Sequence, residues 1–363
     1  MVILEVRGVI DLNQFWPSGE SDADTVNVVI GDDNAFSYRE QDGENPKTTH
    51  VFDDAKVHGS EGVKPAIRVN RENQKHLTIR LQGIDAPELH YQPAPLSRKD
   101  DSITPAQREK FHQFNKKYRQ YLGETAAVRL GAILNELAGG GGGVTTIDCI
   151  VRTLVDSPND VFDTYGRFIG DIIIQKPGDA AGSQETNINL WLAKEGWAFP
   201  TFYASMTQDE INTFLSATSD ARTKRAGIWE YYADEIGDFD FDLLFRGKGA
   251  QPNPDNDKGD VIMPKLFRRY TTFSAYKKAG ISTDDFKSYL SQGRDSCFKT
   301  DEFLEQGPTA SSAYFFNEFI DEMKFSVKPQ DLVFTEKPSK LTDSDGNLIK
   351  SWTSPELRIS EAG

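Results

Sequence analysis

The stretch that decides the fold is Ile79-Arg-Leu-Gln-Gly-Ile-Asp-Ala-Pro-Glu88. It predicts a strand that carries Arg80 and ends in a turn at Gly83, so that Asp85 and Glu88 fall close to one rim. Two carboxylates and a guanidinium at a strand end suit a hard cation and a phosphate, because Ca²⁺ takes oxygen ligands and arginine offers phosphate two parallel donors. Surface salt bridging explains this stretch, taken alone, about equally well.

Further strands are predicted on both sides of this stretch, where β-branched and other apolar residues alternate with polar ones. They cover 2–10, 25–30, 66–70, 76–81, 144–152 and 166–174. Capping residues and closing glycines predict two helices over 187–195 and 207–227. Five or more strands with helices between and after them indicate the α+β class, as an OB-like five-stranded β-barrel with packed helices.

Two more helices are predicted between the hairpin and the later strands. Thr104 at the N-cap, followed by Pro105 and Gln107, predicts a helix start. Four aromatics follow at spacings of three, four and three, which predicts one buried helix face: Phe111, Phe114, Tyr118 and Tyr121. A second helix over 124–137 ends in the glycine run 139–143, which we interpret as a loop.

The 363 residues exceed what one compact domain usually holds. We expect a first domain over 1–240, with insertions at about 31–65 and 96–121. Residues 247–260 are rich in Gly, Pro, Asn and Asp, a composition typical of a linker. Residues 261–363 are then expected to form a smaller C-terminal α+β accessory domain, with targeting, dimerisation and inhibition all open as its role.

The formal net charge of −15 argues against a nucleic-acid partner if the charge is spread evenly, because a polyanion is repelled by an acidic surface. The distribution is uneven, however. Residues 1–60 carry twelve acidic and four basic side chains, whereas residues 61–130 carry eight acidic and thirteen basic ones. The basic region could face phosphate or could be a solvated helix face.

Several other classes find little support. The chain has no apolar run of about 18 residues and no visible secretory leader, so we expect a cytoplasmic protein with no membrane partner. Cys149 and Cys297 are far apart in sequence and are expected to be free thiols. The five histidines include no pair spaced for a helical zinc site.

Five short motifs occur in a characteristic order. They are Asp22-Ala-Asp-Thr25, Arg80 to Glu88, Asp163-Thr-Tyr-Gly-Arg167, Gly196-Trp-Ala198 and Lys224-Arg-Ala-Gly-Ile-Trp229. With these motifs the sequence resembles the staphylococcal-nuclease-like (thermonuclease) family over residues 1–230. The resemblance implies that family's barrel fold and a Ca²⁺-dependent nuclease that hydrolyses phosphodiester bonds of DNA or RNA.

The resemblance also implies a role for each matching residue. Asp24 and Asp85 correspond to carboxylate ligands of the catalytic Ca²⁺, with the backbone carbonyl of Ala86 as a third ligand. Glu88 corresponds to the general base that activates water. Arg80 and Arg167 correspond to the two arginines that clamp the phosphate. Two tyrosines correspond to nucleotide contacts: Tyr165 and Tyr203.

Two departures from the family pattern leave alternatives open. Ala23 replaces the usual glycine, which matters if that turn needs a positive φ. About fifty residues precede the catalytic strand where the family has a short turn, and they hold most of the N-terminal acidic excess. The rival hypotheses are therefore a catalytically silent nucleic-acid or protein-binding module and a latent enzyme whose acidic insertion mimics phosphate. The accessory domain could contact a protein partner or a second copy.

Overall fold

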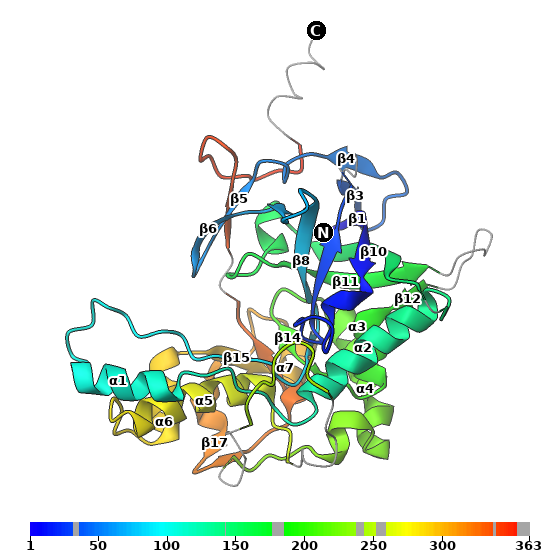
Figure 1. Ribbon diagram of the computed structural model, residues 1–363. Helices are drawn as coiled ribbons and strands as arrows, with labels where there is room; N and C mark the ends of the chain where they lie inside the picture. The colour runs from blue at the N-terminus through cyan, green and yellow to red at the C-terminus, as the bar shows by residue number, and fades with distance from the viewer. Residues whose placement is uncertain are drawn as a thin grey trace.

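The computed structural model describes residues 1–31, 36–141, 143–175, 185–236, 243–251, 259–336 and 339–353. The first 230 residues contain a closed five-stranded barrel (Figure 1). Its strands are β1 (Val2–Asp11), β2 (Thr25–Val29), β8 (Lys75–Leu81), β11 (Phe168–Gln175) and β10 (Thr146–Val155). They pair in that order, and β10 returns to β1 to close the barrel. The predicted OB-like barrel is confirmed.

Alternation of apolar and polar residues produces the barrel core. In β1 every second residue is buried, namely Val2, Leu4, Val6, Gly8 and Ile10, while the residues between them are more exposed. All pairings within the barrel are antiparallel except that of β8 with β11. This one parallel pairing places the first residues of β11 beside the C-terminal end of β8, which is where the site lies.

The predicted insertion at about 31–65 is an ordered β structure in its described part; residues 32–35 lie outside the described residues. β3 (Phe36–Glu40) pairs with β1, and β4 (Lys47–Thr49) pairs with β3. β5 (Lys56–Gly59) and β6 (Gly62–Pro65) form a hairpin. The predicted hairpin before the catalytic strand is also present, since β7 (Arg68–Val69) pairs with β8.

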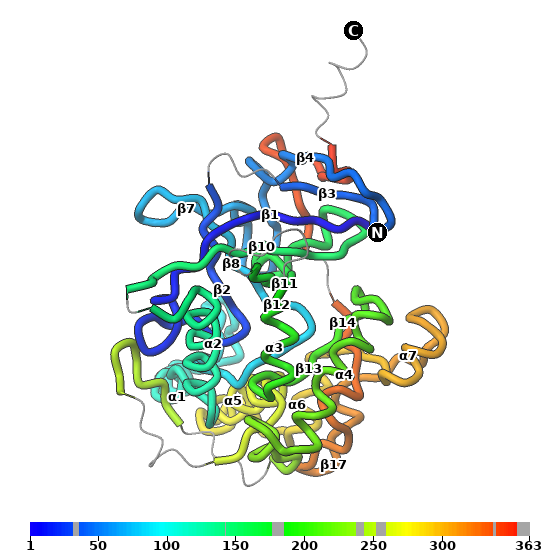
Figure 2. The backbone as a smooth tube through the Cα atoms, turned by 90° about the vertical axis from the view of Figure 1, so that its right-hand side faces the viewer, coloured from blue at the N-terminus to red at the C-terminus, as the bar shows by residue number. Residues whose placement is uncertain are grey.

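Helices cover the lower part of the barrel (Figure 2). They are α2 (Gly123–Leu137), α3 (Ile188–Lys194) and α4 (Gln208–Lys224), close to the predicted bounds. Short strands lie between these larger elements: β9 (Ile84–Asp85), which pairs with β13 (Phe199–Pro200), β12 (Glu185–Asn187), which pairs with β11, and β14 (Phe202–Tyr203). No helix in the described ranges combines the length and the apolar character needed to cross a membrane.

The aromatic helix face predicted over 111–121 is wrong. The capping box of Thr104 and Gln107 is present, but α1 (Pro105–Phe114) ends after Phe114. Tyr118 instead makes backbone bridges to Tyr91 and Leu244. These long-range pairings outweigh the local helical periodicity, because their hydrogen bonds and burial are gained only in the folded chain.

The C-terminal residues form the expected α+β unit. Its elements are α5 (Pro264–Lys278), α6 (Phe286–Gly293), β15 (Ser296–Lys299), α7 (Thr300–Gln306), β16 (Tyr314–Phe315), β17 (Ile320–Asp321), β18 (Lys324–Phe325), β19 (Leu332–Phe334) and β20 (Lys340–Thr342). Figure 1 shows α5 and α6 beside α1, below the barrel. The predicted linker 247–260 lies partly outside the described residues, which exclude 252–258.

Strand pairing joins this C-terminal unit to the barrel half. β14 pairs with β19 in a four-stranded sheet, and β20 pairs with β5 of the insertion hairpin. Near the end of the described chain, the Trp352 ring stacks on Tyr38, with ring centroids 5.7 Å apart. The last described residues therefore cover the insertion strands, as the upper part of Figure 2 shows.

Candidate active site

Strand register brings the first acid and the first arginine together. Thr25 of β2 lies opposite Arg80 of β8, so Asp24, one residue earlier, lies at the same end of the barrel. The chain then turns at Gly83, whose φ of +76° favours glycine, and whose missing Cβ leaves room for the Phe214 ring. The turn returns the chain as β9, where Asp85 pairs with Phe199 of β13. The predicted turn is thus present, and it delivers Asp85 beside Arg80.

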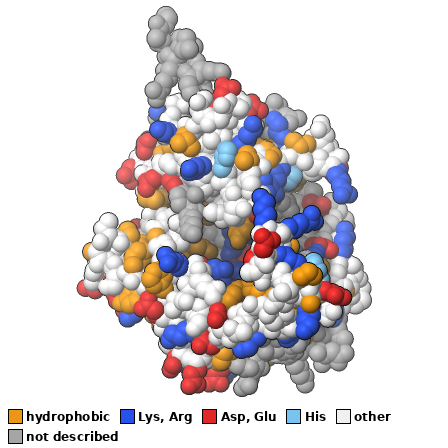
Figure 3. All heavy atoms as spheres, turned by 90° about the vertical axis from the view of Figure 1, so that its left-hand side faces the viewer, with side chains coloured by type: hydrophobic (Ala, Val, Ile, Leu, Met, Phe, Trp, Pro, Cys, Tyr) orange, Lys and Arg blue, Asp and Glu red, His pale blue; other side chains and the backbone are white. Residues whose placement is uncertain are grey.

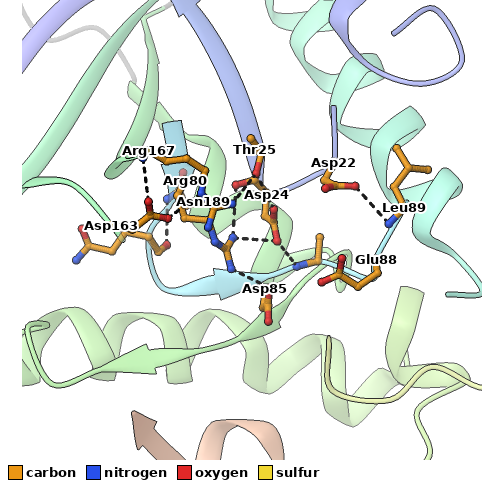
Figure 4. Close-up of polar contacts among 12 residues, drawn as sticks. Asp22, Asp24, Thr25, Arg80, Asp85, Glu88, Leu89, Asp163, Arg167 and Asn189 are labelled. Carbon is orange, nitrogen blue, oxygen red and sulfur yellow. Dashed lines mark hydrogen bonds and ion pairs between the residues drawn. The ribbon is translucent and has the colours of Figure 1, made fainter. Parts of the chain in front are cut away.

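The guanidinium of Arg80 joins two buried carboxylates (Figure 4). Its Nη1 lies 2.9 Å from Asp24 Oδ2, and its Nη2 lies 2.8 Å from Asp85 Oδ1. The backbone N–H of Ala86 donates a further hydrogen bond of 2.9 Å to Asp24 Oδ2. Burial opposes the charged form of Arg80, but the two carboxylates outweigh it and raise its pKa above the ordinary value. Charges that lie 61 residues apart in sequence therefore form one cluster.

The second predicted arginine lies at the same end of the barrel. Arg167 precedes β11, in which Ile169 is the register partner of Arg80. Its Nε donates to Asp163 Oδ2 at 2.7 Å, and its Nη1 lies 3.4 Å from Thr25 Oγ1. Part of the Arg167 side chain remains exposed, so its guanidinium can reach an incoming anion.

The predicted general base, Glu88, is held almost entirely inside the protein. Its side chain is 11% exposed, and its main chain is fixed by reciprocal hydrogen bonds with Gln120. Burial, together with the nearby carboxylates, raises the pKa of Glu88 to about 8, against the opposing charge of Arg268. At pH 7 a carboxyl group with this pKa is mostly protonated, and the ionised form that a general base requires grows as the pH approaches 8.

One functional candidate was missed by the sequence reasoning. Arg268 of α5 reaches across from the C-terminal unit, and its Nη2 lies 2.9 Å from Asp85 Oδ2. The same guanidinium forms an ion pair with Glu88. Burial alone would raise the pKa of Asp85, but Arg268 and Arg80 outweigh it and hold that pKa below its usual range. No local signal distinguishes Arg268 from the neighbouring Arg269, so only the tertiary contact reveals it.

Asp22 is a second residue that the predicted site did not include, although the motif that contains it was recognised. It accepts a hydrogen bond of 3.3 Å from the Leu89 N–H and lies 4.0 Å from the His90 ring. Burial raises the pKa of Asp22 to about 6. The nearby replacement of glycine by Ala23 causes no strain, since Ala23 is not among the residues with positive φ.

The two predicted nucleotide-contact tyrosines have different surroundings. Tyr165 is 50% exposed, and its ring lies 5.5 Å from the Arg167 guanidinium carbon. Tyr203 lies on β14 in a more buried place, where burial raises the pKa of its hydroxyl and the charges of Arg80 and Asp85 act on it. Both tyrosines therefore lie near the charged cluster, but only Tyr165 presents a freely accessible ring.

The carboxylates have the oxygen chemistry that Ca²⁺ prefers, but their arrangement does not fit the ion. Both oxygens of Asp85 are bonded to guanidinium groups, and the backbone of Ala86 meets Asp24 through its N–H. Within the ranges that the structure describes, no group of three or more His, Cys, Asp or Glu side chains is placed to hold a metal ion. A cation could reach these carboxylates only if Arg268 withdrew.

The site therefore combines a closed barrel with carboxylates and arginines gathered at one end. Residues 144–231 match the family model described as staphylococcal nuclease homologue, which confirms the predicted resemblance in this region. The match covers β10, β11, α3 and α4 and includes Arg167, whereas Asp24, Arg80, Asp85 and Glu88 precede it. No curated protein matches the chain.

Proposed function

We propose that this protein hydrolyses phosphodiester bonds of DNA or RNA. The observation that carries the proposal is the single cluster in which Arg80 bridges Asp24 and Asp85, beside the buried Glu88 and the partly exposed Arg167. A scaffold that only binds or packs has no physical need for so many ionised groups at one buried rim.

The residues divide the chemistry in a way that follows from the reaction. A phosphodiester is anionic and repels its nucleophile, so a catalyst must neutralise charge and align water with the leaving oxygen. Arg80 and Arg167 supply fixed positive charge for the phosphate, and each such partner is worth about 10²–10³ in rate. Glu88 takes a proton from the attacking water, a contribution of roughly 10²–10⁴.

Calcium dependence is a separate part of the proposal. If a divalent ion binds, the carboxylates of Asp24 and Asp85 and the carbonyl of Ala86 are its proposed ligands. Such an ion would neutralise further negative charge near the phosphate. We assign no step of the mechanism to it, since Arg268 and Arg80 hold both oxygens of Asp85 in this arrangement.

A nucleic acid is the proposed substrate class because the acidic protein carries basic groups near the site. Figure 3 shows Lys and Arg side chains around the hollow at mid-height on one face. The exposed Tyr165 ring lies against the Arg167 guanidinium, and such a pair suits base stacking beside phosphate binding. An unpaired strand offers both a base face and a phosphate to this pair.

The test is digestion of single- and double-stranded DNA and RNA by the purified protein, with Ca²⁺ or with a chelator. We expect Arg80→Ala and Glu88→Gln to reduce hydrolysis by at least about 100-fold. Matched controls are Arg71→Ala and Glu72→Gln, which change the same residue types in the exposed turn of the β7–β8 hairpin. Equal digestion by wild type and both site variants would show that these residues do not carry the reaction.

The second candidate is a binding module without hydrolysis. The observation that favours it is Arg268, which neutralises both Asp85 and Glu88. The latent-enzyme hypothesis based on the acidic insertion gains less support, because the carboxylates that pair with Arg80 and Arg167 are Asp24, Asp85 and Asp163. Binding of a labelled oligonucleotide without product under every metal condition would favour this second candidate.

A further inference from the structure

We propose that Arg268 is a tethered cation of the carboxylate site, and that it and a divalent metal ion exclude one another. This inference rests on the proposed function of the same site, which it deepens by assigning control of metal access to the C-terminal unit. Arg268 lies 183 residues after Asp85 in sequence, on a helix that is not part of the barrel.

Arg268 contacts the buried carboxylates at positions where a bound cation would contact them. Its two terminal nitrogens lie 3.3 Å from Asp85 Oδ1 and 2.9 Å from Asp85 Oδ2, and its Nη1 also pairs with Glu88. Asp85 is 0% exposed, so water cannot solvate the charge of its carboxylate. A forked guanidinium bonded to both oxygens of a buried carboxylate is among the strongest pairings that a side chain offers.

The charge balance explains why Arg268 and a metal ion compete. Ionised Asp24 and Asp85 carry two negative charges, and Arg80 and Arg268 carry two positive ones, so the net charge is 0 when Glu88 is protonated and −1 when Glu88 is ionised. Without Arg268 this set is more negative by one charge in either state of Glu88, which favours a cation. A metal ion entering beside Arg268 would meet a repelling cation as well as occupied oxygens.

The exchange needs only a side-chain movement. The helix that carries Arg268 is fixed on other sides: Arg269 forms a forked pair with Asp295, and the Thr272 hydroxyl lies 2.7 Å from the Tyr91 hydroxyl. The side chain of Arg268 is nevertheless 32% exposed, so one face of it already meets solvent. A long, partly exposed side chain can rotate away while α5 stays in place.

The experiment is a calorimetric titration of the full-length protein with Ca²⁺ in the absence of nucleic acid. We expect Arg268→Gln to bind Ca²⁺ at least about tenfold more tightly than wild type, since one repelling charge is gone and Asp85 Oδ2 loses its guanidinium partner. Arg269→Gln is the matched control: it removes the same charge one residue along α5, and its affinity should lie within about twofold of wild type. Equal or weaker binding by Arg268→Gln would overturn the proposal.

Thermal unfolding gives a second readout. Ca²⁺ should raise the midpoint of Arg268→Gln more than that of wild type, because at the same ligand concentration a tighter-binding ligand stabilises the folded state more. If Arg268→Gln fails to fold, Arg268→Met provides the test, since methionine carries no charge and cannot donate to Asp85. Tighter Ca²⁺ binding than wild type by Arg268→Met supports the exclusion, and unchanged binding overturns it.

These measurements separate the inference from the function on which it rests. Tighter Ca²⁺ binding by Arg268→Gln without any nuclease activity would support the exclusion and contradict the proposed hydrolysis. Nuclease activity with equal Ca²⁺ binding by wild type and Arg268→Gln would support hydrolysis and overturn the exclusion.

Discussion

Two aspartates of the barrel half differ in their partners and therefore in their electrostatics. Asp85 on β9 is bonded to the guanidinium groups of Arg80 and Arg268, and its pKa lies below the ordinary value. Asp171 on β11 accepts hydrogen bonds of 2.8 Å and 2.7 Å from the amides of two asparagines, Asn187 and Asn189. Burial raises the pKa of Asp171 to about 7.

The difference shows what sets the charge state of an acid removed from water. An amide donor satisfies hydrogen bonding but brings no net charge, so the cost of burying the anion remains. A guanidinium brings hydrogen bonds and a positive charge, and it therefore keeps the carboxylate ionised. The candidate site therefore depends on arginines from two parts of the chain, whereas the side chains that donate hydrogen bonds to Asp171 are neutral amides.

The largest expected effect comes from removing the arginine that bridges two acids. Arg80→Met should lower the free energy of unfolding by about 3–5 kcal/mol, because Asp24 and Asp85 would both lose a buried partner. Urea unfolding near neutral pH, followed by tryptophan fluorescence, measures the change. Arg71→Met, in the exposed hairpin turn, is the control and should change little. A loss below about 1 kcal/mol in Arg80→Met would mean that the bridge contributes little to stability.

Neutralising each aspartate in turn tests the comparison directly. Asp85→Asn keeps the shape but leaves two guanidinium groups facing an amide, so we expect a loss of about 1–3 kcal/mol. Asp171→Asn should change stability by less than about 1 kcal/mol near neutral pH, because its partners are already neutral. The same urea experiment measures both variants. Equal losses would contradict the view that partner charge separates the two positions.

The pH dependence of stability should carry the signature of Asp171. Its pKa rises from 3.8 in the unfolded chain to about 7 in the fold, so the folded protein binds the proton more tightly between these values. The contribution of Asp171 to stability is therefore complete at low pH and is lost as the pH rises to about 7, with a slope of at most about 1.4 kcal/mol per pH unit. Unfolding of wild type and Asp171→Asn across this window measures it. A difference between the two proteins that stays constant with pH would rule out the raised pKa.

The smallest expected effect belongs to the arginine beside Arg268. Arg269 pairs with Asp295 inside the C-terminal unit and is 40% exposed, so Arg269→Gln should cost less than about 1 kcal/mol. Its loss should also diminish at high salt, since exposed pairs are screened. Urea unfolding at low and high salt provides the measurement. A larger, salt-independent loss would place the Arg269 pair among the buried ones.

Local patterns predicted much of the barrel and the barrel side of the site. Alternation of apolar residues located the strands, and the glycine at position 83 predicted the turn. The φ of +76° at Gly83 agrees with that prediction. The aromatic periodicity over 111–121 failed, because Tyr118 pairs with distant backbone instead of continuing a helix. A helical pattern records which residues could share a face, but not which competing contact the folded chain prefers.

By itself, the sequence determined the strand pattern, the order of the five motifs, and the placement of Arg80, Asp85 and Glu88 at one strand end. These depend on residue spacing and turn chemistry, which act over short distances along the chain. Only the tertiary structure decided that Arg268 reaches Asp85 and Glu88 and that β20 pairs with β5. The physical reason is that such contacts depend on how distant segments pack against one another. Every arginine has the same charge and donors, so residue type alone does not reveal which carboxylates it meets.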